Sequence, residues 1–88
     1  MLSYKIGFKP SVEKDLRKIP KIVSVRVIQK IENLKTEPFP SHIVKLSGAE
    51  RLYRIRVGAY RIIYEVDSQT RRITIHYVRH RSQVYEDL

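Results

Sequence analysis

Residues 52–66 have the sequence LYRIRVGAYRIIYEV. Apolar residues alternate with arginines before the glycine, and β-branched and aromatic residues dominate after it, so this stretch predicts two strands. Gly58 and Ala59 between them fit a two-residue hairpin turn, with glycine at the position that needs positive φ. The resulting register places Arg56 directly opposite Arg61.

The two faces of this predicted hairpin differ in chemistry, because side chains alternate between faces along a strand. The apolar and aromatic side chains share the face that we assign to the core: Tyr53, Ile55, Val57, Tyr60, Ile62 and Tyr64. The other face carries Arg54, Arg56 and Arg61. Like charges directly opposite each other cost about 0.2–1 kcal/mol, so the Arg56–Arg61 pair favours a site where a bound anion supplies the negative charge. The alternative is that the guanidinium groups point into solvent without a partner.

The rest of the chain predicts a small α+β domain. The expected elements are a strand at 2–8, a helix from Ser11, a helix at 21–35, a connecting segment at 36–48 and a strand at 72–78. Ser11 is the expected N-cap of the first helix, and Pro20 ends it. The order β-α-α-β-β-β indicates an N-terminal helical hairpin packed on one face of a small antiparallel sheet, in a single domain over residues 1–88.

Composition narrows the classes of function. Eighteen Lys and Arg against nine Asp and Glu give 88 residues a net charge of +9, which favours a polyanionic partner. The alternative is that the charge only solvates the surface. No cysteine is present, so disulfides, thiol nucleophiles and cysteine-based metal sites are excluded. The sequence has neither an apolar run long enough to span a membrane nor a secretory segment, so we expect a cytoplasmic protein without a membrane partner.

Arginine and tyrosine dominate the second half of the chain. Every lysine or arginine after Lys45 is arginine, and five tyrosines lie among these arginines, a combination typical of RNA-binding surfaces.

In the tail, His80 between two arginines could act as a proton acceptor, or be an ordinary surface histidine. Tyr85 could stack on a base, or anchor the C-terminus. Strict alternation places Arg79 on the core face, so a β-bulge must turn it if it joins the arginines. The histidines show no metal-ligand spacing, so neither a metal nor another cofactor is expected.

Several segments together resemble the RelE/ParE superfamily of bacterial and archaeal toxins over essentially the whole chain. They are the β-α-α-β-β-β order, Lys45-Leu46-x-Gly48, the strands at 53–57 and 60–64, and the tail Arg79-His80-Arg81-x-x-Val84-Tyr85. Resemblance to the RelE branch implies that this chain is the toxin of a type II toxin–antitoxin system. Such a toxin is an mRNA interferase, which cleaves mRNA on the ribosome and inhibits translation. It also implies a metal-free reaction in which the ribose 2′-OH attacks the adjacent phosphate, leaving a 2′,3′-cyclic phosphate and a 5′-OH.

The resemblance also implies roles for particular residues. Arg61 and Arg79 match catalytic phosphate-binding arginines, and Tyr85 matches a tyrosine that orients the nucleotide. Arg54 and Arg56 stand where the best-known members have lysines, and arginine cannot readily remove a proton. The general base is then expected to be His80 or Tyr85, or to be a weak one, and His80 could instead act as the general acid. Lys45 and Arg81 are expected to bind phosphate or RNA alongside Arg54 and Arg56. We further expect Arg61 to be exposed, so that replacing it with alanine would barely change stability.

The implied partners are an acidic RelB-like antitoxin, the ribosome and mRNA, with operator DNA bound indirectly through the antitoxin. Two alternatives stay open. A ParE-type toxin shares the fold but inhibits DNA gyrase by protein contact, and the arginines with the tail tyrosine argue against it. The second alternative is a basic module that binds nucleic acid or protein without catalysis.

Overall fold

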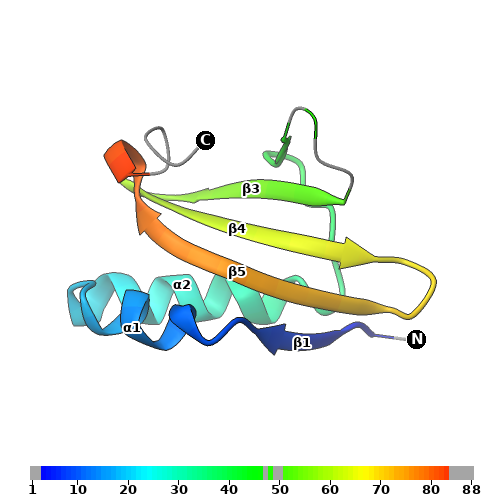
Figure 1. Ribbon diagram of the computed structural model, residues 1–88, viewed down its shortest axis with the longest axis horizontal. Coiled ribbons are helices and arrows are strands. Elements are labelled where there is room, and N and C mark those ends of the chain that lie inside the picture. The colour runs from blue at the N-terminus through cyan, green and yellow to red at the C-terminus, as the bar shows by residue number, and fades with distance from the viewer. Residues whose placement is uncertain (1–2, 47, 49–50, 84–88) are drawn as a thin grey trace.

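Five strands form one sheet beside two helices in the computed structural model, which describes residues 3–46, 48 and 51–83. The elements are β1 (Lys5–Phe8), α1 (Ser11–Arg17), α2 (Lys21–Asn33), β2 (Val44–Lys45), β3 (Leu52–Val57), β4 (Tyr60–Asp67) and β5 (Arg72–His80). The strand order in the sheet is β1-β5-β4-β3-β2, and Figure 1 shows both helices on the same side of the molecule. The α+β prediction is therefore confirmed.

The β3–β4 hairpin has the predicted register. Val57 lies opposite Tyr60 and Arg56 opposite Arg61. Gly58 has φ of +59°, a conformation that glycine adopts without steric cost and that suits a tight hairpin turn. The face predicted to be apolar therefore points to the helices, and the face carrying Arg54, Arg56 and Arg61 points away from them. We call the latter the outer face.

One strand pair departs from the antiparallel prediction. β1 pairs with β5 in parallel, with Lys5 opposite Arg72 and Phe8 opposite Ile75, whereas the other three pairs in the sheet are antiparallel. Local alternation predicts that a segment is a strand, but it carries no information about the direction of a partner more than 60 residues away. The antiparallel arrangement was therefore predictable only for strands joined by short turns.

The core lies between the helices and the inner face of the sheet. Its buried side chains come from both helices and from the sheet: Val12, Ile19, Val27, Ile31, Leu34, Ile55, Val57, Ile62, Tyr64, Val66, Ile73, Ile75 and Val78. On α2, Val27, Ile31 and Leu34 follow the i, i+4, i+7 spacing of one helical face, as expected. The core thus anchors β3, β4 and β5 from one side, whereas their outer face carries the arginines together with the buried Ile63.

The start of α1 differs from the prediction in one detail. Pro10, not Ser11, occupies the N-cap position, and no side chain caps the helix. Ser11 is the first helical residue, so its hydroxyl is not placed to cap the helix and instead donates to the His76 carbonyl oxygen at 3.5 Å. This contact joins α1 to β5 beyond the end of β1.

Tyr64 supplies a prediction about stability. Its side chain is fully buried, and its hydroxyl donates a hydrogen bond to the Pro38 carbonyl at 2.9 Å. Burial raises the pKa of the Tyr64 phenol, and the nearby Tyr53 raises it further. The neutral phenol therefore stabilises the fold fully below pH ~10, and this contribution is lost as the pH rises above that value.

We expect Tyr64→Phe to lower the free energy of unfolding at pH 7 by about 1 kcal/mol, because the Pro38 carbonyl loses its donor. The variant should also lose less stability between pH 9 and pH 11 than the parent protein does. Urea unfolding at each pH measures both effects. Tyr4→Phe is the control, and an alkaline loss of stability that is as steep in Tyr64→Phe as in the parent would contradict the assignment.

Candidate functional site

Three arginines from three neighbouring strands lie in one row across the outer face. Arg56 of β3 lies opposite Arg61 of β4, and Arg61 lies opposite Arg79 of β5. We call these residues the arginine row. Two strand pairings therefore bring together residues that are up to 23 positions apart in the sequence. Arg54 lies on the same face, two residues before Arg56 on β3.

A β-bulge places Arg79 in this row, as the sequence required. Pairing between β4 and β5 shifts at Ile63/Tyr64: Tyr64 lies opposite Ile75, and Ile63 opposite Tyr77, so His76 is the extra residue. The bulge is needed because Ile75 and Val78 are both buried although they are three residues apart. His76 Nε2 lies 3.0 Å from Glu65 Oε1 on β4, which gives the side chain of the unpaired residue a partner.

Arg61 is buried, which corrects the expectation of an exposed side chain. It is 7% exposed, and its Nη1 donates to the carbonyl oxygens of Gly58 and Tyr60, both at 3.0 Å. Alternation predicts the face on which a side chain lies, but it does not predict that a long side chain folds back onto the turn. Two carbonyls of the hairpin turn therefore fix the guanidinium in place.

A cavity of about 430 Å³ opens beside this guanidinium. Its lining residues are His42, Ile43, Val44, Arg54, Arg56 and Arg61. Among the described residues, the lining includes three arginines and no carboxylate, and no carboxylate forms an ion pair with Arg61. The cavity therefore combines a fixed, buried cation with two further cations, an arrangement that attracts an anion.

Arg79 forms the end of the row and has two close neighbours. Its guanidinium carbon lies 4.4 Å from the centre of the Tyr77 ring, and its Nε lies 4.0 Å from Oδ1 of Asp15 on α1. Burial raises the pKa of the Tyr77 phenol, and the Arg79 charge opposes this shift. Tyr77 is therefore neutral at physiological pH and provides a flat surface on which the guanidinium stacks.

His80 lies on the opposite face of the sheet from the arginine row. It pairs with Tyr60, and the two rings meet edge to face with centroids 5.4 Å apart. Its Nδ1 accepts a hydrogen bond from the Ser82 backbone N–H at 3.3 Å, which leaves the ring hydrogen on Nε2 in the neutral form. His80 and Arg79 both line a second cavity, of about 520 Å³, beside α1.

The remaining predicted residues are not part of the row. Lys45 pairs with Tyr53, so it lies on the inner side of β2, away from Arg54. Arg81 is exposed at the start of a short helical turn, and its backbone N–H donates to the Ala59 carbonyl at 2.8 Å. Tyr85 lies outside the described residues. The structure thus gathers Arg54, Arg56 and Arg61 around one cavity and places Arg79 beside them.

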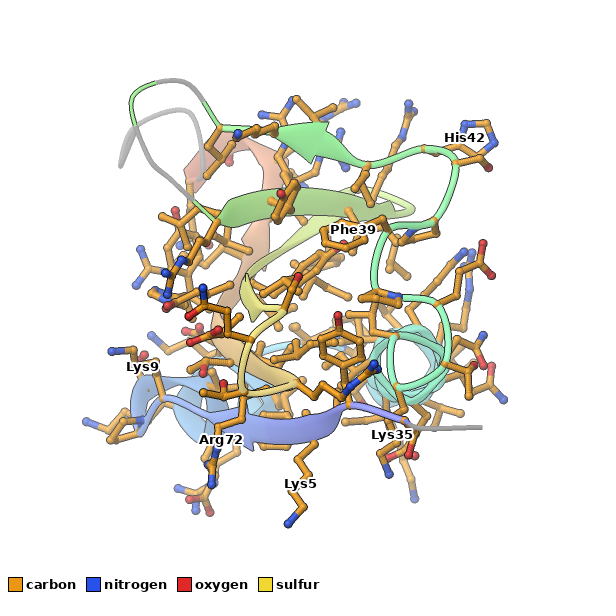
Figure 2. All side chains as sticks on the ribbon, turned by 90° about the vertical axis from the view of Figure 1, so that its right-hand side faces the viewer. Lys5, Lys9, Lys35, Phe39, His42 and Arg72 are labelled. Carbon is orange, nitrogen blue, oxygen red and sulfur yellow. The ribbon has the colours of Figure 1, made fainter. Side chains whose placement is uncertain are left out.

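Sequence reasoning missed two residues of this region, His42 and Asp15. Extending the β2–β3 register by two residues would place His42 opposite Arg56, and His42 lines the arginine cavity. Figure 2 shows it on the loop that leads to β2, at the edge of the molecule. Its position could not be predicted, because the pairing partner of the short β2 was not evident. Asp15 was not among the candidate site residues, since nothing in the sequence predicted that α1 lies beside the end of β5.

The described residues contain neither a cluster of metal-ligand side chains nor a membrane-spanning helix. In the ranges 3–46, 48 and 51–83, no three His, Cys, Asp or Glu residues come together as a possible metal site. No helix in the same ranges is long and apolar enough to cross a membrane.

Comparison with known proteins identifies the family. The model described as ParE toxin of type II toxin-antitoxin system, parDE, matches residues 6–85. Toxin RelE3 of Methanocaldococcus jannaschii is 34% identical over 86 residues, covering 93% of this chain and 96% of that protein. A chain of the archaeal RelE-RelB complex from Pyrococcus horikoshii OT3 has a TM-score of 0.80 at 32% identity, covering 91% of this chain and 97% of that chain. A chain of the RelB-RelE complex from Methanococcus jannaschii has a TM-score of 0.77 at 32% identity, with coverage of 93% and 98%. This chain therefore belongs to the RelE/ParE superfamily of toxins from type II toxin–antitoxin systems.

Proposed function

We propose that this toxin is an endoribonuclease that cleaves mRNA on the ribosome and thereby inhibits translation. The observation that carries the proposal is that Arg54, Arg56 and the buried Arg61 line one cavity on the outer face. A buried cation is costly unless an anion pairs with it, and this cavity offers a place for that anion. A phosphodiester suits the cavity, because guanidinium groups bind phosphate oxygens through paired N–H donors.

The proposed reaction is a transesterification within the RNA, so it needs no second substrate. The ribose 2′-oxygen forms a bond to phosphorus and gives its proton to a base. The bond from phosphorus to the 5′-oxygen breaks, and the leaving oxygen takes up a proton from an acid to become the 5′-OH. Negative charge on the phosphate oxygens grows in the transition state. Arg56, Arg61 and Arg79 would stabilise that charge from fixed positions, which is often the largest catalytic contribution.

Proton transfer falls to a histidine or tyrosine in this proposal, because guanidinium groups stay protonated. His80 and Tyr85 are the candidates that the sequence predicts. Because His80 lies on the inner side of β5, the RNA would have to pass around the end of that strand to reach it. His42 is a third candidate, because it lines the same cavity as Arg56 and Arg61.

We also propose that an acidic antitoxin neutralises the toxin. The related chains were solved in complexes named RelE-RelB and RelB-RelE. In this chain a groove of about 610 Å³ between α2 and β3 carries Arg26, Lys30 and Arg56, and it leads to the arginine cavity. An acidic segment in the groove would cover Arg56 and block access to phosphate.

A second candidate function is inhibition of DNA gyrase. The observation that favours it is the family model itself, which is described as a ParE toxin. Gyrase inhibition would proceed through protein contact and would not require the arginine row. The two functions therefore predict different products and different sensitivities to substitution.

Translation in a cell extract distinguishes these functions. We expect the toxin to cut the translated message, with mapped 5′ ends aligned to codons, and to spare the same message when initiation is blocked. A 2′-deoxy substitution at the mapped position should protect the message. Arg17→Ala, on the exposed surface of α1, is the matched control and should cut normally. An intact message combined with inhibited supercoiling would instead support the gyrase inhibitor.

A further inference from the structure

Asp15 is a nearly buried carboxylate on α1 whose two oxygens reach consecutive residues of β5. Its side chain is 11% exposed. Oδ2 accepts a hydrogen bond from the Val78 backbone N–H at 3.1 Å, and Oδ1 lies 4.0 Å from Arg79 Nε. No other carboxylate among the described residues contacts the arginine row in this way. One acidic group therefore contacts both the backbone and the side chain at the end of the row.

The hydrogen bond to Val78 replaces the strand pairing that β1 provides only to the earlier part of β5. β1 pairs with β5 only as far as Ile75, so beyond that residue β5 has no strand on this side. Backbone N–H groups at a sheet edge need a partner when water is excluded, and α1 covers this edge. Asp15 provides the acceptor at Val78 and so fixes the backbone just beyond the bulge, one residue before Arg79.

The contact with Arg79 constrains the direction of its side chain. Tyr77 lies against the flat surface of the guanidinium, and Asp15 lies at its Nε edge. These two contacts, at different parts of the guanidinium group, restrict the orientations that the planar group can adopt. Because Asp15 meets Nε, the donor nearest the main chain, this pair does not use the two terminal nitrogens, which are the ones that bind phosphate in a fork.

We propose that Asp15 is a positioning residue that holds Arg79 at the end of the arginine row for phosphate binding. The inference rests on the proposed nuclease function and deepens it by assigning a role to a residue that does not touch RNA. If Asp15 had a purely structural role, its substitution would slow cleavage equally in proteins with and without Arg79. If Asp15 instead competed with the RNA phosphate for the charge of Arg79, removing the charge of Asp15 would make cleavage faster.

Asp15→Asn separates these possibilities. The amide oxygen can still accept from Val78 N–H, so the fold should be retained, but the charge facing Arg79 is gone. We expect Asp15→Asn to slow mRNA cleavage by about tenfold, since small losses of alignment are costly at a reacting centre. In an Arg79→Ala background the same substitution should change the rate less than twofold, because the group that it positions is absent. Glu13→Gln, on the same helix and paired with exposed Arg17, should leave the rate unchanged in both backgrounds.

A second measurement does not depend on cleavage. ¹⁵N relaxation of the Arg79 Nε–H should show a side chain that is ordered in the parent protein and mobile in Asp15→Asn, with the Arg26 signal unchanged as a control. Equal order of Arg79 in both proteins would overturn the inference, as would an equal loss of cleavage in the two backgrounds or faster cleavage by Asp15→Asn. If the parent protein cuts no message, the nuclease function fails by that result alone, whereas the relaxation data still decide whether Asp15 orders Arg79.

Discussion

Replacing Arg61 with alanine should reduce mRNA cleavage by about 100- to 1,000-fold, the usual effect of removing one preorganised group that stabilises transition-state charge. The same substitution should lower the free energy of unfolding by about 1–3 kcal/mol, because hydrogen bonds from a charged group to the Gly58 and Tyr60 carbonyls are lost. Arg61 is thus expected to matter for both activity and stability. Cleavage assays at a temperature where circular dichroism shows both proteins folded separate the two effects.

Arg61→Lys is the informative companion variant. Lysine keeps the positive charge but cannot match the planar fork of the guanidinium, so we expect an intermediate loss of cleavage. Exposed Arg17→Ala should affect neither property and controls for loss of net charge. Full cleavage by a folded Arg61→Ala protein would remove Arg61 from the site. An unchanged free energy of unfolding would contradict its buried hydrogen bonds.

Arg56→Glu should have opposite effects on activity and stability. A glutamate at this position would repel the phosphate and lie across from Arg61, so we expect cleavage to fall by about 1,000-fold or more. The substitution also replaces a like-charge pair across the hairpin with an opposite-charge pair. We therefore expect the free energy of unfolding to rise by about 0.2–1 kcal/mol. Urea unfolding and mapped cleavage of a translated message measure the two changes.

Arg56→Gln identifies the source of each effect, since it removes the charge without introducing a negative one. It should relieve the repulsion from Arg61, give part of the gain in stability and still impair cleavage. A stable, active Arg56→Glu protein would show that the outer face does not bind phosphate. A loss of stability in both variants would show that Arg56 supports the fold. It would contradict the proposal that Arg56 lowers the stability of the hairpin but is kept for phosphate binding.

The hairpin and its faces were predictable because short-range geometry determines them. A two-residue turn at Gly58 fixes the register, and period-two alternation then assigns each side chain to a face. The same alternation showed that Arg79 could join the arginines only through a bulge. It did not locate the bulge at His76, because its position depends on which residues of β5 pack in the core.

Other features depend on long-range packing and could not be derived from local patterns. The parallel pairing of β1 with β5, the position of α1 beside β5 and the contact of Asp15 with Arg79 all join segments distant in sequence. The burial of Arg61 has a different cause, since it depends on the path of a flexible side chain. The bulge turns Arg79 to the outer face and leaves His80 on the inner face. The sequence prediction placed both residues in one site because they are neighbours in the chain.

The central claim is that one RNA phosphate is held on the outer face of the sheet by the arginine row. A structure of the toxin on a translating ribosome, with a message carrying a 2′-O-methyl group at the mapped cleavage position, tests it most directly. We predict that the scissile phosphate lies within hydrogen-bonding distance of the Arg56 and Arg79 guanidinium groups and next to the Arg61 cavity. A phosphate bound on the inner side, against Lys18 and the helices with the arginine row empty, would contradict it.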